Sequence, residues 1–320
     1  MRRLLIALAC LFASFGAALA QPGPPPEPVV TVTLLGTGAP PPLHDRFGPA
    51  TLVQAGGQAL LFDAGRGSTI RLWQLGLPGS ALNATFLTHL HSDHVVGIPD
   101  LWLTGWLRGP HGGRTTAYRL IGPEGTVELA AGLETAFAGD VRFRIAGGLP
   151  REGGRIAAQS FAGDGVVYEV DGLRVTAFRV DHGPWVDAAF GYRIDYRGRS
   201  VVISGDARPS DSIVRHGRGV DLLVHEVAFA PAGSEEAAAA VLNTHTQPRE
   251  AGRIFAATRP GMAAYSHFAR PALGGGPPAL LSDLLTWTRE VYDGPLTLGE
   301  DLTAFAIWAD GAVTVRSPRP

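Results

Sequence analysis

Three histidines and one aspartate lie within six consecutive positions, directly after the apolar stretch of residues 84–87. They are His89, His91, Asp93 and His94. In an extended backbone alternate side chains share a face, so His89 and His91 can bind one ion. Asp93 and His94 fall where the chain turns and suit a second ion. Imidazole and carboxylate are zinc ligands, whereas a chance cluster in a polar loop would leave costly unpaired groups.

Three further polar residues stand where apolar runs end, namely His182, Asp206 and His267. In α/β sheets this is the edge where catalytic and binding groups collect. Each alone could be a satisfied loop histidine or a helix-capping aspartate. Together with the first cluster, they predict a site with seven metal ligands.

The composition excludes some classes of function. The chain has 320 residues, a charged fraction of 18% and a net charge of -2, so no overall field attracts nucleic acid or an anionic membrane. All 27 basic residues are arginine, which excludes a Schiff-base lysine. The single cysteine, Cys10, precedes the expected mature start, so no thiolate ligand is expected.

The first residues resemble an export signal. Arg2 and Arg3 precede an apolar run that ends in Ala18-Leu19-Ala20, a pattern typical of a cleaved signal peptide over residues 1–20. The run is shorter than the ~20 residues that a spanning helix needs. Residues 21–28 read as a Pro-rich linker and residues 29–320 as one hydrolase domain. We therefore expect a periplasmic or secreted protein, without membrane attachment in its mature form.

Short apolar runs bounded by Gly and Pro alternate with helical stretches, which predicts an α/β layered domain. Strands are expected at 29–35, 50–55, 59–63, 84–88, 173–180, 190–196, 200–204, 221–225, 262–266 and 302–308. Helices are expected at 68–75, 95–107, 125–137, 248–258 and 279–291. Gly56-Gly57 and Arg197-Gly198-Arg199 favour hairpins. Residues 147–165 are Gly-rich and are expected to form a mobile loop.

The spaced ligands carry a family resemblance. The pattern His89-x-His91-x-Asp93-His94 with His182, Asp206 and His267 resembles the ligand set of the metallo-β-lactamase superfamily. The order of these residues along the chain is similar to that in the branch of ribonuclease Z, arylsulfatases and phosphodiesterases. Segments 34–38, 60–65 and 265–268 extend the likeness over most of the chain. The resemblance implies a four-layer αββα sandwich and two zinc ions per chain.

The same resemblance implies a role for each ligand. His89, His91 and His182 would hold one zinc ion, Asp93, His94 and His267 the other, and Asp206 would bridge them. Asp63 would orient ligand imidazoles through hydrogen bonds, unless it is an ordinary turn aspartate.

Two close divalent ions lower the pKa of a shared water, but the leaving group still needs a proton donor. His245 is the candidate acid, and Glu226 resembles the glutamate that pairs with it in ribonuclease Z-like proteins. Asp93, His245 and Glu226 are thus the expected catalytic residues. His225 is expected to be structural, and Arg46 to be solvated rather than bound to a substrate anion.

One feature departs from tRNA-processing ribonuclease Z, which carries a basic arm between the third-motif histidine and the bridging aspartate. Only 23 residues separate His182 from Asp206, and they predict a plain hairpin. With no lysine and an export signal, tRNA is an improbable substrate, and a small anionic ester is expected. A homodimer is possible.

The leading hypothesis is a hydrolase of phosphodiester or sulfate ester bonds, and a lactonase or thioesterase with the same ligands is the nearest rival. A true β-lactamase fits less well, since Asp206 has no counterpart in its usual ligand set. A persulfide dioxygenase with one iron and a non-catalytic binding module are the remaining alternatives.

Overall fold

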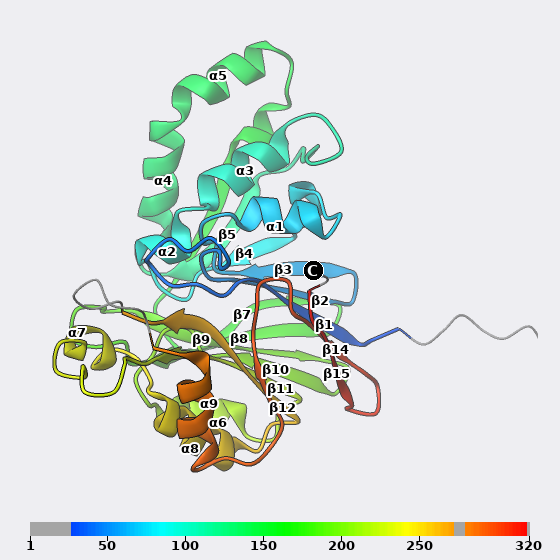
Figure 1. Cartoon of the computed structure of the whole chain (residues 1–320). Coiled ribbons are helices and arrows are strands. Elements are labelled where there is room, and N and C mark those ends of the chain that lie inside the picture. The colour runs from blue at the N-terminus through cyan, green and yellow to red at the C-terminus, as the bar shows by residue number, and fades with distance from the viewer. Residues whose placement is uncertain (1–26, 272–278, 319–320) are drawn as a thin grey trace, which may run out of the picture.

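Two β-sheets packed face to face form the centre of the protein (Figure 1). The computed structural model describes residues 27–271 and 279–318. From edge to edge, the first sheet contains β15 (Val313–Arg316), β14 (Ala304–Ile307), β1 (Val30–Gly36), β2 (Ala50–Ala55), β3 (Gln58–Phe62), β4 (Ala84–Phe86), β5 (Tyr118–Pro123) and β6 (Ile156–Phe161). The second contains β13 (Leu296–Leu298), β12 (Met262–Ala269), β11 (Leu222–Ala228), β10 (Arg199–Ile203), β9 (Ala189–Tyr196), β8 (Leu173–Val180) and β7 (Gly165–Val170).

Helices cover the outer face of each sheet. The helices of the first half are α1 (Ser68–Gln74), α2 (Ser92–Val95), α3 (Ile98–Trp106), α4 (Thr126–Ala136) and α5 (Ala138–Ala146). Those of the second half are α6 (Asp211–Gly217), α7 (Ala239–Leu242), α8 (Pro248–Thr258) and α9 (Leu281–Arg289). In Figure 1, α1, α3 and α4 lie beside the first sheet, and α6, α8 and α9 beside the second. This confirms the expected four-layer αββα sandwich. Among the described residues, no helix combines the length and apolar character needed to cross a membrane.

The central strands are largely apolar because both of their faces are buried. Leu60 and Phe62 of β3 enter the core between the sheets, whereas Leu61 enters the core under the outer helices. Phe62 and Phe86 stack in the inner core with ring centroids 4.9 Å apart. A one-residue slip of β3 would exchange these two sets of side chains, so the packing fixes the register.

Parallel pairing brings the ends of several strands to one edge. β3, β4 and β5 are parallel neighbours in the first sheet, and β10, β11 and β12 are parallel neighbours in the second. β8 is antiparallel to β9, and β9 to β10, so β8 runs in the same direction as β10. The loops that follow β3, β4, β8 and β10 therefore meet where the two sheets face each other.

Most of these helices and strands were predicted from the sequence. β8 and α8 have the predicted bounds, and both predicted hairpins form, between β2 and β3 and between β9 and β10. The predicted signal peptide and nearly all of the predicted linker fall outside the described residues.

The expected loop over residues 147–165 was wrong. This segment contains a 3-10 turn, η2 (Arg151–Gly154), and strand β6, which pairs with β5. Two of its glycines serve packing, not mobility. A Cβ on Gly153 would lie 2.3 Å from Cδ1 of Trp106, and one on Gly154 would lie 2.9 Å from Cη2 of the same indole. The Gly-rich composition therefore reflects close contact with a buried tryptophan.

Candidate metal centre

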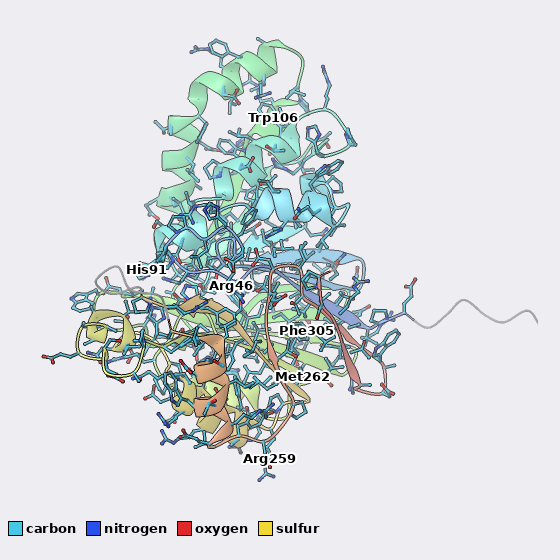
Figure 2. All side chains as sticks on the ribbon, in the orientation of Figure 1. Arg46, His91, Trp106, Arg259, Met262 and Phe305 are labelled. Atoms are coloured by element: carbon cyan, nitrogen blue, oxygen red, sulfur yellow. The ribbon has the colours of Figure 1, made fainter. Side chains whose placement is uncertain are left out.

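The first group of site residues is a triad of histidines. His89 and His91 follow β4, and His182 follows β8. Nε2 of His89 lies 2.9 Å from Nδ1 of His91, and Nε2 of His182 lies 3.3 Å from the same atom. His89 and His182 are buried, whereas His91 is exposed, so the triad opens to solvent on one side. Figure 2 shows His91 at the level where the two sheets meet.

Asp206, which follows β10, lies at the middle of the site. Its Oδ2 is 3.2 Å from Nε2 of His267, 3.3 Å from Nε2 of His94, 3.8 Å from Nε2 of His182 and 3.9 Å from Nε2 of His89. Burial alone would raise the pKa of this carboxyl, but the charges of His267 and His94 hold it well below its usual range. The carboxylate is therefore ionised and faces imidazoles of both groups.

The second group of site residues lies on the other side of Asp206. Oδ2 of Asp93 is 3.5 Å from Nε2 of His94 and 3.3 Å from Nε2 of His267. Asp93 and His94 belong to the short helix α2, and His267 lies near the end of β12 with a φ of 43°. A positive φ is unusual for a residue with a side chain, and such strain concentrates at functional sites.

The donor set fits metal ions. Two atoms that each lie about 2.0–2.1 Å from a tetrahedral zinc ion are about 3.3 Å apart, close to the separations within each group. Within the described residues, Nε2 of His94 is buried without a hydrogen-bond partner. Burial also lowers the pKa of His89 well below its ordinary value, so that this imidazole is neutral, as a ligand must be. All seven predicted ligands are thus brought together.

Hydrogen bonds behind the ligands set their orientation. Asp63, directly after β3, has its Oδ2 2.9 Å from Nδ1 of His94, and its Oδ1 accepts the backbone N–H of Thr88 at 2.8 Å. Nδ1 of His182 lies 2.8 Å from the carbonyl oxygen of Thr244. A bond at Nδ1 leaves Nε2 unprotonated and directed into the site. Neither Thr88 nor Thr244 could be predicted from the sequence, because their contacts depend on backbone atoms that folding brings together.

We expect Asp63→Asn to weaken metal binding about 10- to 100-fold, the usual effect of losing a carboxylate behind a ligand histidine. The amide keeps the size of the side chain but removes the charge that holds His94 in place. Competition with a fluorescent zinc chelator measures this affinity. Asp195→Asn, at a partly exposed ion pair with Arg193, is the matched control and should bind zinc as the wild type does. Wild-type affinity in Asp63→Asn would show that this residue is only a turn aspartate.

A histidine–glutamate pair borders both groups of ligands. Nδ1 of His245 lies 3.1 Å from Oε2 of Glu226, and Oε1 of Glu226 accepts the backbone N–H of Thr246 at 2.7 Å. The His245 ring is 4.9 Å from that of His182 and 5.6 Å from that of His267. Burial would lower the pKa of His245, but the charge of Glu226 and the hydrogen bond to it raise that pKa to about 9. His245 is therefore protonated at neutral pH beside the ligands.

Two other predictions concern residues next to the site. His225 is completely buried, and its ring packs edge-on against Phe255, in keeping with a structural role. The expectation of a solvated Arg46 was wrong. Its Nη1 donates to Oγ1 of Thr37 at 2.6 Å and to the carbonyl oxygen of Gly299 at 2.8 Å, so this guanidinium is engaged by the protein.

Comparison with known proteins identifies the family. The profile of the Beta-lactamase superfamily domain matches residues 59–268, a range that contains all seven predicted ligands. The chain belongs to the metallo-β-lactamase superfamily. It is 33% identical over 283 residues to ribonuclease Z of Mycobacterium bovis (strain BCG / Pasteur 1173P2), covering 86% of this chain and 97% of that protein. This likeness places the chain in the ribonuclease Z and phosphodiesterase branch, as expected.

Solved structures of the metallo-β-lactamase superfamily share the fold. The protein YhfI from Bacillus subtilis aligns with a TM-score of 0.67 at 20% identity, over 86% of this chain and 98% of that one. The short form of human tRNase Z aligns with a TM-score of 0.64 at 22% identity, with the same coverage. The family relationship makes the protein a metal-dependent hydrolase of ester bonds. We expected tRNA to be an improbable substrate, but the relatives are named ribonuclease Z. RNA therefore has to be tested as a substrate.

Proposed function

We propose that the protein holds two zinc ions and hydrolyses phosphodiester or sulfate ester bonds of small molecules, in the periplasm or outside the cell. The export proposal rests on the sequence of residues 1–20. One ion would be held by the histidine triad, the other by Asp93, His94 and His267, with Asp206 shared between them. The observation that carries the choice of bond is the His245–Glu226 pair, because an ester with a poor leaving group needs a proton donor.

The chemistry of the proposed reaction divides between metal and protein. Bound zinc would supply an activated water and neutralise an oxygen of the anionic ester. His245 donates a proton to the leaving oxygen. The proton comes from Nε2, because Nδ1 faces Glu226. Glu226 in turn is fixed by the backbone N–H of Thr246, so the pair is preorganised for this transfer.

The test compares the hydrolysis of three kinds of bond. Zinc-loaded protein would be assayed on matched nitrophenyl phosphodiester, nitrophenyl sulfate and lactone substrates. Turnover of the phosphodiester or the sulfate supports the proposal. Hydrolysis of the lactone alone would instead favour the lactonase or thioesterase reading.

RNA is the second candidate because the relatives of this chain include proteins named ribonuclease Z. Against it, residues 183–205 contain a loop and the β9–β10 hairpin, with no basic arm between His182 and Asp206. A labelled tRNA precursor with a 3′ extension, incubated with the same zinc-loaded protein, distinguishes the two. Endonucleolytic removal of the extension at rates above those for the nitrophenyl esters would make RNA the substrate.

We expect Glu226→Gln to shift the pH dependence of kcat/KM. Since the carboxylate raises the pKa of His245 to about 9, the acid stays protonated until the pH approaches that value, and activity then declines. An amide at Glu226 removes this charge and lowers the pKa, so the decline should begin at a lower pH. The measurement is a pH profile with an ester that has a poor leaving group. An unchanged alkaline limb would mean that another group sets it.

A further inference from the structure

An exposed tryptophan stands close to the metal centre. The side chain of Trp185 is 81% exposed, the highest value among the large apolar side chains of the described residues. A single exposed apolar residue is ordinary on a protein surface. The position of Trp185 is unusual, because it lies three residues after His182, on the loop between β8 and β9.

The turn that leads to Trp185 packs against the residue before His245. Gly183 has a φ of 89°, and a Cβ at this position would lie 2.7 Å from Cγ2 of Thr244. Only glycine permits this approach with this backbone conformation. Two residues of chain span at most about 7 Å, so the backbone of Trp185 lies within that distance of the contact with Thr244.

This side of the site is where the leaving group departs. In the proposed reaction, the leaving oxygen takes its proton from His245, whose ring lies beside those of His182 and His267. A group attached to that oxygen must therefore extend outward past Thr244, His245 and the neighbouring turn. Trp185 is the large side chain that this turn presents.

The turn is anchored by hydrogen bonds at its first residues. The N–H of Gly183 donates to Oδ1 of Asp181 at 2.9 Å, and the backbone N–H of Arg208 donates to the carbonyl oxygen of Asp181 at 2.6 Å. The Arg208 guanidinium also pairs with the Asp181 carboxylate, so each neutralises the other. Pro184 restricts φ within the turn. The anchored turn holds Trp185 at the surface.

The opposite side of the opening is also partly apolar. Leu90, between His89 and His91, is 36% exposed and lies over Gly125, where a Cβ would be 2.7 Å from Cδ1 of Leu90. Leu90 is thus an exposed apolar side chain next to the exposed candidate ligand His91.

We propose that Trp185 is a specificity-determining residue, which stacks on a planar aromatic group in the leaving portion of the substrate. The substrates of this site would then be aryl esters. This inference rests on the proposed function, because it takes the direction of departure from His245. Aromatic pairs contribute about 0.5–1.5 kcal/mol beyond their buried area, which corresponds to a preference of about two- to tenfold.

The test uses binding, so that it does not depend on turnover. Phenylphosphonate and methylphosphonate would be titrated calorimetrically into the zinc-loaded wild type and into Trp185→Ala, Trp185→Phe and Trp73→Ala. Trp73 is 48% exposed on α1 and serves as the matched control. We expect the wild type, Trp185→Phe and Trp73→Ala to bind phenylphosphonate up to about tenfold more tightly than methylphosphonate. Trp185→Ala should bind the two within about twofold of each other.

The same preference in Trp185→Ala as in the wild type would overturn the inference, and so would its loss in Trp73→Ala. An equal loss of affinity for both phosphonates in Trp185→Ala would also overturn it, since that result indicates damage to the metal centre. A different result decides the proposed function. Loss of the phenyl preference in Trp185→Ala, in a protein that cleaves no nitrophenyl ester, would support the contact and overturn the hydrolysis.

Discussion

His245→Ala should lower kcat by about 10²- to 10⁴-fold on a phosphodiester with an alkyl leaving group, the range expected for loss of a general acid. His245 lies 3.1 Å from Glu226, whose charge holds it protonated, so its imidazolium can supply the proton. On a nitrophenyl ester the loss should be much smaller, because nitrophenolate leaves without protonation. The measurement is steady-state kinetics on the two esters.

Two controls separate this role from structural damage. His245→Ala should retain the metal content of the wild type, because His245 is not one of the seven expected ligands. His111→Gln, at a loop residue whose ring contacts Trp73, should behave as the wild type does. A change of less than about twofold on both esters would contradict the assignment, since general acids contribute far more than that. Such a result would favour hydrolysis of a carbonyl ester, which needs no such acid.

Asp206→Asn should remove metal and activity together. Asp206 Oδ2 faces imidazoles of both groups of ligands, and its carboxylate is the charge that they share. An amide has nearly the same shape but cannot balance two dications. We expect metal affinity to fall by more than the about 100-fold that is typical of a supporting residue, and turnover to fall with it. Inductively coupled plasma mass spectrometry and kinetics on the same sample test this.

The comparison with Asp63→Asn shows whether Asp206 acts as a ligand or only as a supporting residue. Asp63 contacts one ligand from behind, whereas Asp206 faces four imidazoles directly. The loss of metal should therefore be larger in Asp206→Asn. Equal metal content in Asp206→Asn and the wild type would contradict the bridging role.

Local sequence patterns were enough to predict most of the strands and the residues of the candidate site. β11 is buried along its whole length, and in β8 the apolar residues are buried while the two arginines are exposed. The apolar pattern of each strand is therefore visible without knowledge of its partners. The site residues were found for a related reason. Metal ligands of the right types follow such runs, and the parallel order of β10, β11 and β12 brings their ends together.

Features that the local apolar pattern does not show were missed. β15 is largely exposed and forms by pairing with β14, so its own residues carry little apolar pattern. Arg46 was expected in solvent because arginine usually lies there. Its partner Gly299 is 253 positions away in the chain. Phe268, over whose ring the Arg46 guanidinium packs at 4.3 Å, is also distant in the chain. Nothing near Arg46 in the sequence indicates either contact.

Glycine-rich composition was a misleading signal for residues 147–165. Gly153 and Gly154 were taken as a sign of mobility, but they are buried against the indole of Trp106. Composition alone does not distinguish a glycine that frees the backbone from one that lets a large side chain approach.

The metal content of the wild-type protein tests the central claim most directly. Protein purified without chelators would be analysed for transition metals by mass spectrometry, with its concentration fixed by amino-acid analysis. Because the described site presents two groups of ligands that share Asp206, we predict two zinc ions per chain. A chain that binds no transition metal, or a single iron, would contradict the account.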